Sequence, residues 1–107
     1  MSKETIKMKQ IRLVRVGLKE VLTMAEQTAN SHRHVIAENW DKERSDKEAR
    51  KAIHKAHRGL AKAREIINEC QRQLWVTKRD LRKLNHQHDL RLKALAENQY
   101  ERTSLLG

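Results

Sequence analysis

The stretch from Ser45 to Leu84, SDKEARKAIHKAHRGLAKAREIINECQRQLWVTKRDLRKL, decides the fold. Its apolar and small side chains recur at alternating steps of three and four residues, which is the heptad pattern of a helix that packs against another helix. The stretch therefore predicts one long amphipathic helix. The first seam position carries Ile53, Leu60, Ile67, Leu74 and Leu81, and the second carries Ala56, Ala63, Cys70, Thr77 and Leu84.

The start of this helix has its own signal. Ser45-Asp46-Lys47-Glu48 has the spacing of a capping box, in which the serine oxygen accepts from a free backbone N–H and the glutamate reaches back. Asp46 and Glu48 also suit the positive end of a helix dipole. We expect a turn over about 41–45, followed by a helix over about 46–102.

A second helix is indicated before the turn. Its apolar stripe spans about 100° of a helical wheel, which predicts a helix over about 4–40. The polar piece 28–34 is its weakest part, and a break there stays open because Asn30-Ser31 disfavours the helix interior. The stripe consists of Ile11, Val14, Leu18, Val21, Leu22, Ala25, Ala29, Ile36 and Trp40.

The two helices fit together as a hairpin. Beyond Leu84 the next seam positions hold His88 and Arg91, so the apolar seam weakens where a folded-back first helix would end. This agreement favours an antiparallel pair over one continuous helix. We expect an all-α fold, with residues 1–107 forming one helical-hairpin (coiled-coil) domain whose second helix is longer than the first.

More apolar surface is present than one two-helix seam can use. Ala52, Gly59 and Ile66 widen the inward face of the second helix, and two helices of this length bury little surface. We therefore expect the hairpin to be completed by self-association or by a partner. The residues predicted to form such a protein interface are Leu13, Met24, Trp75, Val76, Leu92, Leu95 and Tyr100.

Composition limits the class of protein. Hydrophobic residues make up 37% of the chain, and proline and phenylalanine are absent, which argues against a β-sheet domain. The single cysteine excludes an intrachain disulfide, and we interpret Cys70 as a small buried side chain. No apolar stretch approaches the roughly 20 residues of a membrane span, and the basic start lacks the apolar core of a secretory signal. We expect a cytoplasmic protein.

Charge supplies the functional hypothesis. The net charge of +10 favours an anionic partner, and basic residues recur on the outer face of the second helix. We expect electrostatic attachment to nucleic acid or to a nucleoprotein complex; a rod kept soluble by its charge is the plain alternative. A further basic cluster comprises Lys3, Lys7, Lys9, Arg12, Arg15 and Lys19. The predicted nucleic-acid contacts are Arg50, Lys51, Lys55, Arg58, Lys62, Arg72, Arg79 and Lys83.

No motif points to catalysis. The sequence contains no glycine-rich phosphate loop, nucleophile elbow or zinc-protease motif, so we expect neither an enzyme nor a cofactor. His54 and His57 share a helix face, but no third ligand stands near them, so no metal site is predicted. The other function that fits is a protein-interaction adaptor, chaperone or inhibitor that docks on a larger machine through its coiled-coil faces. In architecture alone, the hairpin resembles coiled-coil proteins of type III and flagellar export and the tRNA-binding arm of seryl-tRNA synthetases.

Overall fold

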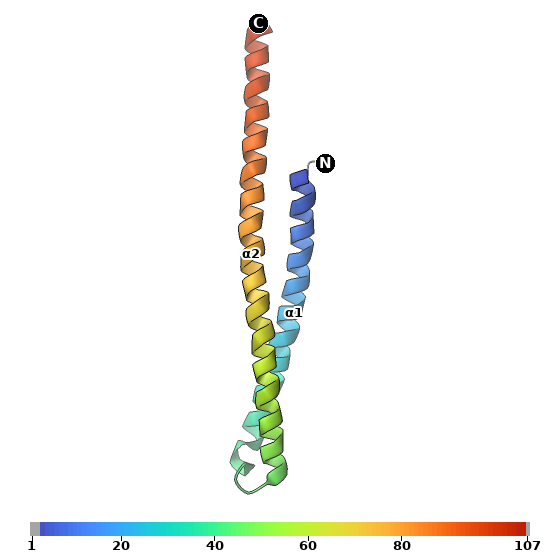
Figure 1. Cartoon of the computed structure of the whole chain (residues 1–107), viewed down its shortest axis with the longest axis vertical. Coiled ribbons are helices and arrows are strands. Elements are labelled where there is room, and N and C mark those ends of the chain that lie inside the picture. The colour runs from blue at the N-terminus through green and yellow to red at the C-terminus, as the bar shows by residue number, and fades with distance from the viewer. Residues whose placement is uncertain (1–2, 107) are drawn as a thin grey trace.

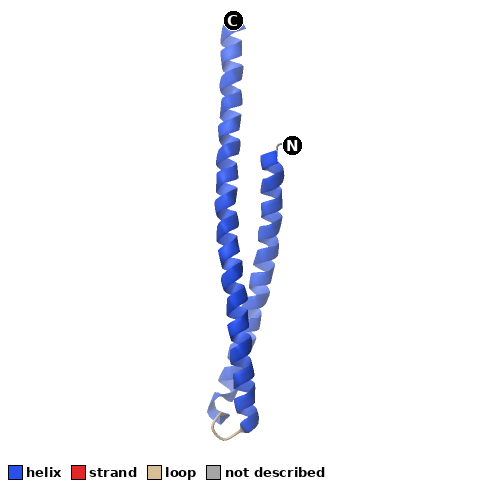
Figure 2. Cartoon of the chain, in the orientation of Figure 1, coloured by secondary structure: helices blue, strands red, loops and turns tan. Residues whose placement is uncertain are grey.

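The chain forms a helical hairpin in a computed structural model that describes the backbone of residues 3–106 and the side chains of residues 3–99 (Figure 1). Helix α1 spans Lys3–Asn39, a short 3-10 helix η1 spans Trp40–Lys42, and α2 spans Lys47–Leu106. The described backbone contains no strand (Figure 2). The molecule measures 92 × 18 × 15 Å, and α2 extends well beyond the start of α1. The all-α hairpin with a longer second helix is confirmed.

The turn ends one residue later than the capping box predicts. The backbone N–H of Arg50 donates to the carbonyl of Asp46 at 3.1 Å, which makes Asp46 the N-cap. The carboxylate of Asp46 accepts from the N–H of Glu48 at 2.9 Å. The expectation that Ser45 caps α2 is therefore wrong. Ser45 lies in the turn, where its N–H donates to the carbonyl of Lys42.

Helix α1 does not break at its polar segment. The hydroxyls of Thr28 and Ser31 donate to the carbonyls four residues earlier, at 2.9 and 3.0 Å. Arg33 donates to the side-chain oxygen of Asn30 at 2.8 Å. Because these polar groups bond along the helix instead of competing with it, residues 28–34 stay helical.

The α2 side of the seam is as predicted near the turn. Ile53, Ala56, Leu60, Ala63 and Cys70 are all no more than 5% exposed. They pack against small residues of α1, since Ala25 is 7% and Ala29 is 0% exposed. Short side chains on both helices let the two backbones approach closely, so Ile53 and Leu60 can fill the space between them and the seam excludes water.

The α1 side of the seam differs from the prediction. Val14, Val21 and Trp40 were expected in the seam and are 52%, 46% and 64% exposed. The seam follows a strict three-four spacing, which selects one edge of the broad apolar stripe and leaves the valines outside. The residues of α1 that face α2 are Met8, Ile11, Arg15, Leu18, Leu22, Ala25, Ala29, His32 and Ile36.

Packing differs between the two ends of the hairpin. We call residues 25–70 the tip half, and residues 3–24 with 71–99 the open half. Every described residue that is buried lies in the tip half, with the exception of Met8. In the open half Leu74, Leu81 and Leu84 are only half-buried. The seam is therefore tight near the turn and looser toward the free ends.

Polar contacts fix the register of the open half. The guanidinium of Arg15 crosses the seam and donates to the carbonyl of Leu74 at 2.7 Å and to the hydroxyl of Thr77 at 3.0 Å. At the start of α1, Arg91 donates to the carboxylate of Glu4 at 2.8 Å. A polar layer inside a coiled coil specifies alignment at some expense in stability.

Candidate nucleic-acid interface

All eight cations predicted to contact nucleic acid are exposed on α2. They lie at the heptad positions that point away from α1 or flank that outer face. They form two groups in the structure: three have a carboxylate partner, and five have none within the described residues. The five are Arg50, Lys55, Arg58, Lys62 and Lys83.

Arg72 is the most firmly paired of the eight. Its guanidinium donates to both carboxylate oxygens of Glu69, at 2.6 and 3.0 Å, and Gln73 donates to the same carboxylate at 2.8 Å. These hydrogen bonds lower the pKa of Glu69 to about 2 and raise the pKa of Arg72. A phosphate would have to compete with this carboxylate for Arg72.

Two more of the predicted contacts are engaged. Arg79 lies over the ring of Trp75 at 5.5 Å from its centre and is 3.5 Å from a carboxylate oxygen of Asp80. Lys51 is 3.8 Å from the carboxylate of Glu48. The outer row of α2 is thus a less uniform surface than its sequence indicates.

Within α2, the longest stretch without an acidic residue lies near the turn. From Arg50 to Arg64 the chain contains six basic residues and no acidic one, and Glu65 and Glu69 then interrupt the row. At 1.5 Å per residue this segment is about 21 Å long. We call Arg50, Lys55, Arg58, Lys62 and Arg64 the tip basic face; within the described side chains, none of them has an ion-pair partner.

The N-terminal cluster is divided as well. Arg15 differs from the other members, because its guanidinium is bonded inside the seam. Lys7 lies near Lys83, and both line a shallow hollow of about 300 Å³ that Asp80 also borders. The carboxylate of Asp80 partly balances the charge at this point.

The predicted protein-interface residues occupy separate surfaces. Leu13 and Met24 are 73% and 66% exposed on α1, and Trp75 is 63% exposed on α2. Val76 is half-buried and offers less surface than expected. The side chain of Tyr100 lies outside the described residues.

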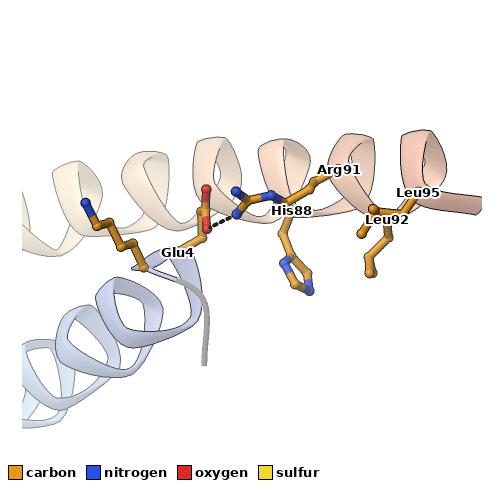
Figure 3. A pocket seen from close by; sticks show the side chains of 6 residues that line it. Glu4, His88, Arg91, Leu92 and Leu95 are labelled. Carbon is orange, nitrogen blue, oxygen red and sulfur yellow. Dashed lines mark hydrogen bonds and ion pairs between the residues drawn. The ribbon is translucent and has the colours of Figure 1, made fainter. Parts of the chain in front are cut away.

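Beyond the start of α1, the face of α2 that continues the seam is uncovered. Leu92 and Leu95 are 53% and 54% exposed there. The Nδ1 atom of His88 is buried and has no hydrogen-bond partner. Figure 3 shows these side chains beside the Glu4–Arg91 ion pair. An open hollow of about 600 Å³ is lined by Lys3, Glu4, His88, Arg91, Leu92 and Leu95.

The described residues contain no cluster of three or more His, Cys, Asp or Glu side chains that could hold a metal. His54 and His57 are exposed. Cys70 is 5% exposed in the seam, as its interpretation as a small apolar residue requires. No helix in the described part of the chain is long and apolar enough to cross a membrane.

Sequence reasoning missed two contacts that shape these surfaces. The ring of His32 lies directly over Gly59, where a side chain on the glycine would meet it. Arg15 crosses the seam although charge is rare in such positions. Gly59 could have been suspected, because glycine inside a helix is unfavourable unless a close neighbour needs the space. Comparison with protein-family models, with curated proteins and with solved structures finds no significant match to this chain.

Proposed function

We propose that this chain is a non-enzymatic binding protein that attaches to the phosphate backbone of duplex nucleic acid, free or within a nucleoprotein complex. The observation that carries the proposal is the tip basic face, whose cations lie exposed and without carboxylate partners among the described residues. Unpaired cations can neutralise phosphates and release the counterions condensed on a duplex.

The chemistry of this surface favours phosphates over bases. Recognition of single strands relies on several aromatic side chains that stack on bases. The whole chain has two tryptophans and one tyrosine, and Arg79 already lies over Trp75. Lysine and arginine along one helix face contact the backbone and carry little sequence information. The expected binding is therefore salt-dependent and weakly sequence-specific.

Rigidity supports the same location. Behind the tip basic face, Ile53, Ala56 and Leu60 are buried in the tight part of the seam. Cations on a well-packed helix lose less freedom when they bind than cations on a mobile segment. Arg72 and Arg79, in contrast, would have to give up existing partners.

The test is a titration of labelled DNA and RNA duplexes of about 20 base pairs, followed by fluorescence anisotropy at several salt concentrations. About five phosphate contacts predict a slope near −4.5 for log affinity against log salt on duplex DNA. In the triple variant Lys55→Glu, Arg58→Glu and Lys62→Glu, the affinity should fall at least about 100-fold.

A matched control separates this face from net charge. Lys7→Glu, Arg12→Glu and Lys19→Glu on α1 also take the charge from +10 to +4, because each reversal subtracts two. We expect this control to weaken binding far less than the α2 triple. Equal losses of affinity in the two variants would show that only net charge matters. The absence of duplex binding at low salt would contradict the proposal.

A second candidate, a protein-interaction adaptor, chaperone or inhibitor, is favoured by the uncovered end of α2. Leu92 and Leu95 are exposed where α1 has ended, and Trp75 is exposed on the outer face. Affinity capture after nuclease treatment tests it. A protein that is retained by the wild type and lost from Leu92→Glu, Leu95→Glu or Trp75→Ala would support docking; equal retention by all variants would contradict it.

A further inference from the structure

The outward face of α1 carries an apolar strip that the hairpin does not use. Ile6, Leu13 and Met24 are 44%, 73% and 66% exposed, although their side chains are large and apolar. Gly17 lies between them, so the strip recurs at steps of seven, four and seven residues. Val14, Val16 and Val21 flank it and are 52%, 55% and 46% exposed. This spacing is that of a helix face that packs against one more helix.

The strip is symmetric about position 15. Ile6 and Met24 are each nine residues from that position, and Leu13 and Gly17 are each two residues from it. A twofold interface brings the same patch of two copies together, with each position facing its symmetric counterpart. We propose that a second copy of this chain binds here, with its α1 antiparallel and the twofold axis passing position 15.

The large and small residues match in this pairing. Ile6 of each copy would face Met24 of the other, and Leu13 would face Gly17. An added Cβ at Gly17 meets no atom within 4 Å, so nothing inside the hairpin requires a glycine at this position. A leucine that enters the space over a glycine supplies the reason. A hollow of about 550 Å³ lined by Val16, Thr23 and Met24, among others, lies on this face.

The polar residues of the strip favour the antiparallel arrangement. Gln10 and Glu20 are each five residues from position 15, so the Gln10 amide of one copy could donate to the Glu20 carboxylate of the other. A parallel pair would set Glu20 against Glu20, which is unfavourable. In the antiparallel pair Lys7 faces Thr23 and Lys9 faces Val21, so these lysines meet no like charge.

The dimer and the nucleic-acid interface use different helices of the hairpin. The strip lies on α1 and points away from α2, whereas the cations of the tip basic face lie at exposed positions of α2. Each copy carries a charge of +10, so salt should strengthen the dimer by screening repulsion, while it weakens duplex binding. The opposite salt dependence distinguishes failure of one proposal from failure of the other.

Sedimentation equilibrium of the full chain at several salt concentrations tests the dimer. Gln10→Glu should raise the dissociation constant about 5- to 10-fold by placing a carboxylate against Glu20 of the other copy. The double variant Gln10→Glu, Glu20→Lys should restore it to within about twofold, because a new ion pair forms. Within one chain the two positions are about 15 Å apart, so the rescue requires a second copy.

Leu13→Glu should weaken the dimer at least about tenfold, because it places a charge in an apolar contact. Glu26→Lys is the control for Glu20→Lys, since it makes the same charge change at an exposed position outside the strip. A chain that stays monomeric at millimolar concentration would overturn the proposal, and a different protein would then be the candidate to bind the strip. A dimer that ignores Leu13→Glu, or a double variant weaker than both single variants, would overturn it as well.

Discussion

The tip half and the open half of the hairpin share one architecture and differ in both packing and charge. In the tip half, Ala29 and Ile53 are 0% and 2% exposed, and the cations of the tip basic face have no acidic partner among the described residues. In the open half the seam leucines are half-buried and Arg15 spans the two helices. There, Arg72 and Arg79 are held by Glu69 and by Trp75.

The difference shows that packing and the pairing of surface charges change together along α2. Near the turn, small residues bring the helices together and hold the outer face of α2 in a fixed shape. Farther away, alignment depends on polar contacts such as Arg15 with Thr77. There the surface cations Arg72, Arg79 and Arg91 are engaged by other side chains of the hairpin. We propose that a basic row on a helix binds phosphates only where its charges are left unpaired.

The largest expected effect concerns the seam itself. Ile53→Ala in the tip half should lower the free energy of unfolding by about 2–4 kcal/mol, because it leaves a cavity among buried residues. Leu81→Ala in the open half should lower it by roughly 1 kcal/mol, since that side chain is only half-buried. Urea unfolding followed by circular dichroism measures both. Equal losses would contradict the division into two halves.

A smaller effect is expected at the contact between His32 and Gly59. An alanine at position 59 gains about 1 kcal/mol of helix propensity but displaces the imidazole that lies over the glycine. Gly59→Ala alone should therefore leave stability unchanged or lower it. In a His32→Ala background the same change should stabilise by about 1 kcal/mol, and thermal unfolding of the four variants measures the coupling. Additive effects would show that the ring does not constrain position 59.

The smallest expected effect is the pH dependence of stability that comes from Glu69. Its hydrogen bonds with Arg72 and Gln73 lower its pKa from 4.5 to about 2, so the unfolded chain binds a proton more readily than the folded one. The stabilisation is thus complete above pH 4.5 and is lost as the pH falls toward 2. Because the pair is exposed, the effect should be slight.

Melting curves of wild type and Glu69→Gln between pH 7 and pH 2 measure this effect. The wild type should melt slightly higher at neutral pH, and the difference should vanish at the acidic end. A difference that stays constant or grows as the pH falls would assign the effect of the substitution to something other than ionisation of this carboxyl.

Much of the fold could be predicted from the sequence of α2. Ile53, Leu60 and Ala63 follow a heptad without interruption, so burial follows directly from spacing. The α1 seam was predicted less well because hydrophobicity favours Val14 over Arg15. Contacts across the seam place Arg15 there instead of Val14, because the long Arg15 side chain reaches the carbonyl of Leu74 while its methylenes remain in the seam.

The sequence predicted which cations of α2 are exposed, but it did not predict as well which of them have partners on the hairpin. The exposed cations of α2 follow from the heptad. The pairing of Arg72 with Glu69, and of Arg79 with Trp75, could have been read from spacings of three and four residues. The bonding of Arg15 inside the seam depends on the register between two helices, which neither helix determines alone.

Two charge reversals on α2, compared in one duplex titration, test most directly whether binding depends on the unpaired cations of the tip basic face. The first is Lys55→Glu, Arg58→Glu and Lys62→Glu in the tip half, and the second is Arg72→Glu, Arg79→Glu and Arg91→Glu in the open half, where each guanidinium already has a partner. Both change the net charge from +10 to +4. We expect at least about a 100-fold loss of affinity for the first and less than about a fivefold loss for the second. Equal losses, or a larger loss for the open half, would contradict this expectation.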